Sequence, residues 1–137
     1  MNCIQPIILA AVLLCWPCIG QAQPNKGLYD FQERCGTRAQ EFFDREHRSR
    51  IKETKDGTAF MNFENHYSSR LNKCFFLEIA EIYPTRSKML RLFDVNDNEG
   101  YGIYTEGGNL PFVCVVRDRM CRSEAEWLEL IKPFMED

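Results

Sequence analysis

The side chains of this chain that could carry covalent or metal chemistry are its seven cysteines and two histidines, His47 and His66. A cysteine nucleophile needs a free thiol beside a histidine, and the nearest such pair in sequence is His66 and Cys74. Zinc and redox sites often use a C-x-x-C pair, and here that spacing occurs at Cys15 and Cys18, inside an apolar N-terminal run. The sequence contains neither a Gly-x-Ser-x-Gly elbow nor a phosphate-binding glycine loop. We therefore predict no catalytic residues, no metal and no cofactor.

The apolar N-terminal run has the features of a secretory signal peptide. Its densest part, residues 7–16, is shorter than the roughly 20 residues that a transmembrane helix needs. Gly20 and Ala22 place small residues at the two positions that a signal peptidase reads, although the run carries no Lys or Arg. We predict a cleaved signal at residues 1–22 and a single domain at residues 23–137. Cys3, Cys15 and Cys18 would leave with the signal.

Four cysteines remain in the exported domain: Cys35, Cys74, Cys114 and Cys121. An even number in an exported domain indicates disulfides, and four cysteines allow three pairings. We favour Cys35–Cys74 and Cys114–Cys121, because the polar segment VVRDRM could turn the chain back between the last two. In the loop-entropy description the long bridge stabilises the fold by about 4 kcal/mol and the short one by about 2.5 kcal/mol.

Two acidic patterns also invite a chemical interpretation. Glu78 and Glu81 could form an acid/base couple, but a role in surface solubility explains such a pair more simply. Residues 94–100, DVNDNEG, alternate oxygen donors as a calcium loop does. Their glycine comes one position late, and Thr105 stands where a bidentate glutamate is required. We predict surface glutamates in the first case and a plain hairpin turn in the second.

Polar, aromatic and cationic residues gather in the segment NHYSSRLNKCFF, beside one expected disulfide. This composition is typical of a recognition patch, and equally of a turn beside a sheet edge. The candidate patch residues are His66, Tyr67, Arg70, Asn72 and Lys73. A second cationic cluster, between residues 45 and 55, is interrupted by glutamates and reads as a solvated face. The formal net charge of −3 argues against a nucleic-acid partner.

Hydrophobic spacing places these residues on a helix, a sheet and a second helix. Apolar residues recur at helical spacing over residues 28–47, and a charged loop is expected over residues 45–57. Ser123 and Glu126 form a capping box that opens a C-terminal helix. Strands are expected around residues 60–65, 73–82, 89–95, 101–105 and 111–116. The fold class predicted is α+β, with four to five antiparallel strands and both helices on one face of the sheet.

Residues 66–75, HYSSRLNKCF, resemble the HYNxxLNKC-like core of a group of small exported bacterial proteins of unknown function. That group also has a C-x(2-3)-A-x-x-F-F helix, a D-x-N-x-N hairpin followed by YG, and a C-x-S-E-x-E…KP[FY]ME end. The matching residues are Cys35, Ala39, Phe42, Phe43, Asp94, Asn96, Asn98, Tyr101, Gly102, Cys121, Ser123, Glu124, Glu126, Trp127, Ile131, Lys132, Pro133, Phe134, Met135 and Glu136. Ser68 departs from the usual Asn. The resemblance implies bacterial export and two disulfides, and it carries no activity.

The functional expectation is therefore an exported, non-enzymatic domain, periplasmic or secreted, that binds a protein or a cell-envelope component. It should have no nucleic-acid partner and no stable membrane insertion after cleavage. The alternative is a small periplasmic hydrolase or thiol-redox enzyme, and a third class is a purely structural envelope protein. The thiol-redox alternative requires free thiols, which the predicted disulfides would remove.

Overall fold

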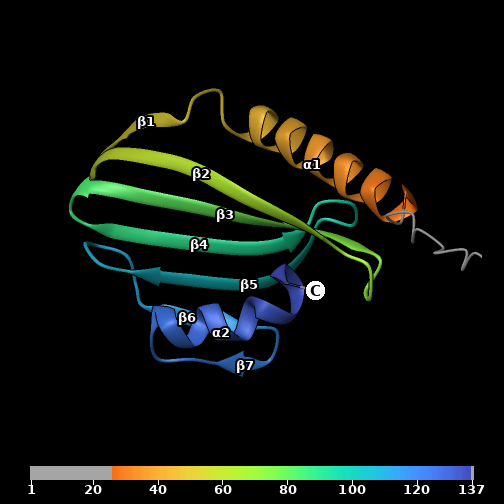
Figure 1. Cartoon of the computed structure of the whole chain (residues 1–137). Coiled ribbons are helices and arrows are strands. Elements are labelled where there is room, and N and C mark those ends of the chain that lie inside the picture. Colours follow the sequence, from red (N-terminus) through yellow and green to blue (C-terminus); the bar gives the residue numbers. More distant parts are fainter. Residues whose placement is uncertain (1–25, 137) are drawn as a thin grey trace, which may run out of the picture.

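The computed structural model describes residues 26–136, which form two helices and a seven-stranded antiparallel sheet (Figure 1). The predicted signal peptide, with Cys15 and Cys18, lies outside the described residues. In chain order the elements are α1 (Lys26–Glu46), β1 (Ile51–Thr54), β2 (Gly57–Ser68), β3 (Lys73–Pro84), β4 (Ser87–Asp94), β5 (Glu99–Glu106), β6 (Val113–Val116), β7 (Arg119–Met120) and α2 (Glu124–Met135). The α+β class is confirmed, with more strands than expected.

Strand β1 lies inside a segment that the sequence predicted to be a loop. It pairs antiparallel with β2, with Ile51 opposite Phe60 and Thr54 opposite Gly57. Residues 45–57 were expected to form a solvent loop because charged residues dominate them, and this expectation is wrong for Ile51–Thr54. Charged side chains suit an edge strand, since they discourage pairing with other chains. The other extra strand, β7, consists of two residues in the hairpin between Cys114 and Cys121.

The sheet is a simple meander in which every strand pairs with its sequence neighbours, in the order β1 to β7. Its tight turns place Asn72, Arg86 and Asn98 at positive φ. Gly57 has a φ of 130°, and a Cβ atom there would lie 1.9 Å from the carbonyl oxygen of Tyr83. A glycine is therefore required where the β1–β2 hairpin meets the end of β3.

The two helices cover opposite faces of the sheet. Along β3, Phe75 and Leu77 pack into the cluster that contains α2, whereas Phe76 and Ala80 pack into the cluster that contains α1. The expectation that both helices share one face is therefore wrong. Because β3 carries apolar side chains at consecutive positions, both faces of that strand need a cover. We call these two sides the α1 face and the α2 face.

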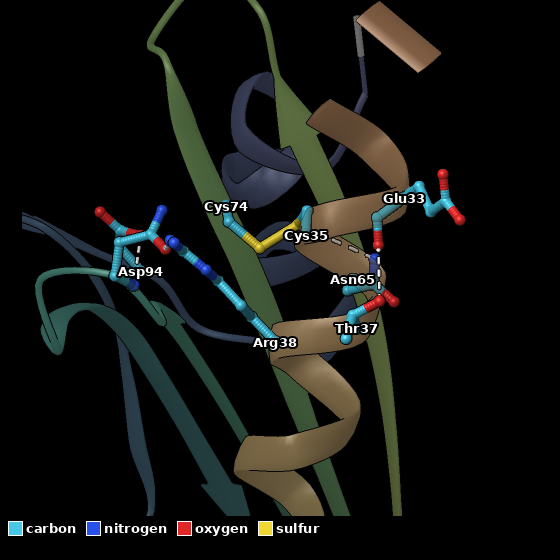
Figure 2. The surroundings of a disulfide bond; sticks show 8 residues. Glu33, Cys35, Thr37, Arg38, Asn65, Cys74 and Asp94 are labelled. Carbon is cyan, nitrogen blue, oxygen red and sulfur yellow. Dashed lines mark hydrogen bonds between the residues drawn. A yellow bond between two sulfur atoms is a disulfide. The ribbon is translucent and has the colours of Figure 1, made fainter. Parts of the chain in front are cut away.

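The predicted disulfide pairing is confirmed, and each bridge ties a helix or hairpin to the sheet. Cys35 of α1 bonds Cys74 of β3, with 5.4 Å between their Cα atoms (Figure 2). Cys114 and Cys121 bridge the β6–β7 hairpin, with 5.0 Å between their Cα atoms. All four are buried.

The capping box is also confirmed at the start of α2, where the backbone N–H of Glu126 donates to the Ser123 hydroxyl.

Candidate functional site

A groove lies on the α1 face where the helix does not reach. An α-helix is about 10 Å wide and strands are spaced about 4.8 Å apart, so one helix covers about two strands. Helix α1 packs mainly on β2 and β3, and its Phe42 reaches Phe93 of β4 with 5.0 Å between the ring centroids, which leaves the α1 face of β5 and β6 open. The resulting groove has a volume of about 1150 Å³. Its lining includes Phe42, Arg45 and Glu46 from α1 and Arg91, Phe93, Gly100, Ile103, Val115, Arg117 and Asp118 from the sheet and its turns.

The floor of this α1-face groove is apolar. Strand register aligns Ile103 of β5 with Arg91 of β4 on one side and with Val115 of β6 on the other. Gly100 pairs with Phe93, so a side chain at this position would point toward the same face. A Cβ atom added to Gly100 meets no atom within 4 Å. The floor therefore has open space above a row of aliphatic and aromatic side chains.

A polar triad from three separate elements adjoins the groove, and of its members Arg91 lines the groove. Glu78 of β3 is 1% exposed, and its Oε1 atom lies 2.5 Å from Nε2 of His47, which directly follows α1. The other carboxylate oxygen accepts hydrogen bonds from Nε and Nη2 of Arg91. Arg91 stands directly opposite Glu78 in the β3–β4 register. The assignment of Glu78 to the surface is therefore wrong.

The sequence did contain a signal for this burial. Glu78 shares the α1 face of β3 with Phe76 and Ala80, both buried, because side chains two positions apart point the same way. Its partners could not be identified, since His47 and Arg91 are distant in sequence and the register was unknown. A buried carboxylate without partners would be strongly destabilising, so the loss of either partner alone should weaken the fold.

The triad does not assemble a recognisable catalytic site. Among the described residues no hydroxyl or thiol is hydrogen-bonded to His47, so no side-chain nucleophile accompanies the His47–Glu78 pair. Within residues 26–136 no cluster of three or more His, Cys, Asp or Glu side chains could hold a metal ion. What remains available is Arg91, whose side chain is 46% exposed and borders the groove. A guanidinium has five N–H donors, and Glu78 occupies only its inner edge.

A second arginine stands on the helical wall. Arg45 lies 5.1 Å from the ring centroid of Phe42 and forms an exposed ion pair with Glu46, at 3.3 Å. The turn after β6 closes the far end of the groove with Arg117 and Asp118. Arg117 stacks 3.9 Å from the ring centroid of Tyr101 and donates to Glu99. The groove thus combines cationic walls with an apolar floor.

The candidate recognition patch from sequence divides over several environments. Tyr67 is buried on the α1 face, stacks on Phe31 at 5.2 Å, and donates its hydroxyl hydrogen to Asn72 at 2.7 Å. His66 precedes it on the strand, so its side chain lies on the α2 face. Arg70 donates to the backbone carbonyl of Pro133 in α2. The structure brings Tyr67 and Asn72 together and separates them from His66 and Arg70.

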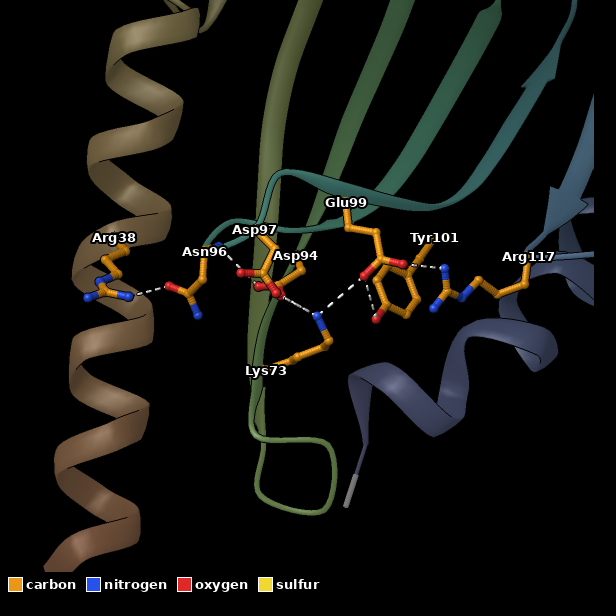
Figure 3. A network of polar contacts seen from close by, with 8 residues as sticks. All are labelled: Arg38, Lys73, Asp94, Asn96, Asp97, Glu99, Tyr101 and Arg117. Atoms are coloured by element: carbon orange, nitrogen blue, oxygen red, sulfur yellow. Dashed lines mark hydrogen bonds and ion pairs between the residues drawn. The ribbon is translucent and has the colours of Figure 1, made fainter.

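Lys73, the fifth candidate, lies in an acidic network at the end of the sheet (Figure 3). Its Nζ atom is 2.8 Å from Asp94, 2.9 Å from Asp97 and 3.3 Å from Glu99. The hydrogen bonds that Lys73 donates, first to Asp94 and then to Asp97, raise the pKa of Lys73. Lys73 lowers the pKa of Asp97, and Arg117 followed by Lys73 lowers that of Glu99. The loop at residues 94–100 is a hairpin turn, as predicted, and an ammonium group balances its carboxylates.

Free thiols are absent from the described residues, because all four cysteines are bridged and buried. Figure 2 shows Cys35–Cys74 between α1 and the sheet, with the side-chain nitrogen of Asn65 3.9 Å from the Cys35 sulfur. Buried disulfides are poorly accessible to thiolate attack.

Within residues 26–136 no helix is long and apolar enough to span a membrane. No protein-family model, curated protein or solved structure matches this chain.

Proposed function

We propose that this protein is an exported, non-enzymatic binding domain whose α1-face groove receives a segment of a partner protein or of a cell-envelope component. The observation that carries the proposal is the groove itself, with an apolar floor of Phe93, Ile103 and Val115 between polar walls. Small-molecule pockets are typically enclosed and about 300–1,000 Å³. A groove of about 1150 Å³ that opens along one sheet face suits a chain segment better.

Export is supported by two independent features. The N-terminal run has the length and the small residues of a cleaved signal, and the domain carries two buried disulfides. Disulfides persist in oxidising compartments such as the periplasm and the extracellular medium. We therefore place the domain outside the cytosol, with residues 1–22 removed.

A hydrolase is the second candidate, and it rests on the contact between His47 and Glu78. A histidine held by a buried carboxylate is the usual form of a general base. Here Arg91 binds the same carboxylate, and among the described residues no nucleophile lies within hydrogen-bonding distance of His47. The exposed group of the triad is the arginine rather than the imidazole, since the side chain of His47 is only 14% exposed. This arrangement favours binding over catalysis.

Site-specific photocrosslinking in the secreting cell tests the binding proposal. A photoreactive phenylalanine at Ile103 should crosslink one defined partner, whereas the same residue at Glu64, exposed on the α2 face, should not. Gly100→Leu fills the groove without a backbone clash and should reduce crosslinking from position 103 at least tenfold. Equal yields from positions 103 and 64, or a yield that Gly100→Leu leaves unchanged, would contradict the proposal.

A further inference from the structure

We infer that the α1-face groove selects a segment in which a carboxylate, bound by Arg91, stands beside an apolar side chain that lies on Ile103. This inference rests on the proposed function, because it specifies the chemistry of the segment that the groove receives. The bound group is named by its chemistry: an aspartate or glutamate side chain, or a chain-terminal carboxylate, within an otherwise apolar stretch. The partner is a protein segment of this kind.

The guanidinium of Arg91 is already held in one orientation before a ligand binds. Glu78 is fixed in the sheet and 1% exposed, and it holds Nε and Nη2 of the guanidinium. His47 occupies the other oxygen of the same carboxylate, so Glu78 has no freedom to turn away. The outer edge of the planar guanidinium is left for a ligand, and this edge matches the two oxygens of a carboxylate. An arginine held in this way loses little side-chain entropy on binding.

Arg91 also stands directly beside the apolar floor of the groove. Arg91 and Ile103 are directly opposed on neighbouring strands, and Ile103 is in turn opposed to Val115. The Cβ atoms of directly opposed residues lie about 5 Å apart on the same face, so Arg91 and Ile103 are cross-strand neighbours. A segment that lies across both can present a carboxylate to Arg91 and an apolar side chain to Ile103. The groove thus distinguishes an acidic residue beside an apolar one from an isolated charge.

The other charged residues of the groove determine where a bound segment can carry further carboxylates. Arg45 adds a second exposed cation on the helical wall, while its partner Glu46 disfavours further carboxylates at that end. At the opposite end the turn after β6 presents Asp118 beside Arg117, whose guanidinium is already held by Glu99 and Tyr101. A uniformly acidic polymer would meet both Glu46 and Asp118. We therefore expect a preference for single carboxylates between apolar residues over a polyanion.

The test compares three capped pentapeptides with the mature, disulfide-bonded protein: acetyl-Leu-Glu-Leu-Glu-Leu-amide and its counterparts with glutamine or lysine in place of glutamate. Titrations followed by amide chemical shifts should place the glutamate peptide on Ile103 and Val115. Its dissociation constant should be about tenfold lower than that of the glutamine peptide, corresponding to about 1.4 kcal/mol. The lysine peptide should bind most weakly.

The matched variant is Glu78→Gln with Arg91→Gln. It removes both charges together, so that no unpaired charge remains buried, whereas Arg91→Gln alone would leave Glu78 without its cation. The double variant should bind the glutamate and glutamine peptides equally. Arg34→Gln, an exposed change elsewhere on α1, should keep the preference. The thermal midpoint of each variant shows that it is folded.

The remaining outcomes separate the two proposals. Equal binding of the three peptides in the groove would reject the carboxylate and leave the binding function standing. Absence of peptide binding, together with a specific crosslink from position 103, would likewise reject only the carboxylate. Shifts confined to residues outside the groove, together with no specific crosslink from position 103, would reject both.

Discussion

The two faces of the sheet differ in how completely a helix covers them. Helix α2 contacts β2 at one side and β5 and β6 at the other, so the sheet curls around it. Its Trp127 is fully buried, and the α2 face has the larger core cluster. Helix α1 packs mainly on β2 and β3 and reaches β4 through Phe42, and a groove occupies the remainder of its face. The α2 face therefore supplies stability, and the α1 face supplies an accessible surface.

Each face buries one carboxylate, and the two differ in where their cations lie. On the α1 face Glu78 is 1% exposed and fixes Arg91 at the groove. On the α2 face Asp94 is fully buried opposite Phe75 and pairs with Lys73, which is 23% exposed at the edge of that core. A buried ion pair is a poor way to gain stability, and of these two pairs it is Glu78–Arg91 that borders the groove, which is consistent with the proposed role in recognition.

The largest expected effect is from Trp127→Ala on the α2 face. The change removes a fully buried indole, which also donates to the carbonyl oxygen of Val115, and should lower the free energy of unfolding by about 3–5 kcal/mol. Ile103→Ala on the groove floor should lower it by only about 1–2 kcal/mol, because that side chain is partly exposed. Urea unfolding measures both. Equal losses would contradict the division between the faces.

The two disulfides should differ in their contribution. Replacing Cys35 and Cys74 with serine opens a loop with a sequence separation of 39 and should lower the free energy of unfolding by about 4 kcal/mol. The same change at Cys114 and Cys121 removes a bridge with a sequence separation of only seven, and should lower the free energy of unfolding by about 2.5 kcal/mol. Denaturant midpoints of the two double variants test the order. A reversed order would show that the hairpin bridge also holds α2 in place.

Gly100 and Gly102 of β5 compare the faces directly, because a register shift opposite Leu92 and Phe93 puts these two glycines on opposite faces. A Cβ atom at Gly102 would lie 3.1 Å from the carbonyl oxygen of Val115 and 3.4 Å from Nε1 of Trp127. Gly102→Ala should therefore destabilise the fold by about 1–3 kcal/mol. Gly100→Ala points into the groove and should change stability by less than about 0.5 kcal/mol. Thermal unfolding under identical conditions decides between them, and a destabilising Gly100→Ala would mean that the groove is narrower than described.

Tyr104→Phe should slightly stabilise the α2 face. The hydroxyl of Tyr104 is buried without a hydrogen-bond partner among the described residues. Burial first, and then the nearby Glu106 carboxylate, raise the pKa of this phenol. Removing an unpaired buried hydroxyl should raise the free energy of unfolding by about 1 kcal/mol, as measured in urea. A loss of stability would show that a bound water satisfies the hydroxyl.

The smallest effect concerns acid stability and the Lys73 network. The pKa values of Asp97 and Glu99 are lowered in the folded state, so they stabilise it above their ordinary values of about 4 and lose that contribution as the pH falls further. Lys73→Met should flatten the decline in stability below about pH 4. Unfolding midpoints between pH 6 and pH 2 show this. An unchanged acid slope would mean that the network contributes no measurable stability.

The sequence predicted the local features of the fold well. Helical spacing identified both helices, and the capping box fixed the start of α2 at Ser123. The turn composition at residues 94–100 predicted the β4–β5 hairpin rather than a calcium loop. The disulfide pairs followed from the even cysteine count and the short polar turn before Cys121. Each of these signals lies within a few residues of the structure that it predicts.

The candidate site depended on contacts that no local pattern contains. The residues of the expected recognition patch all lie within the short segment 66–73, yet strand alternation sends His66 and Tyr67 to opposite faces. Glu78 resembled a surface residue until the register placed Arg91 opposite it and α1 brought His47 above it. The charged composition of residues 51–54 concealed an edge strand.

The sequence by itself determined both helices, the strands β2 to β6, the favoured disulfide pairing and the α+β class, because hydrophobic period, caps and turns act over short distances. The tertiary structure alone decided which helix covers which face, since consecutive apolar residues on β3 show only that both faces need a cover. It also decided the groove, because one helix spans about two of seven strands. The surface proposed for binding is the part of the sheet that α1 is too narrow to cover.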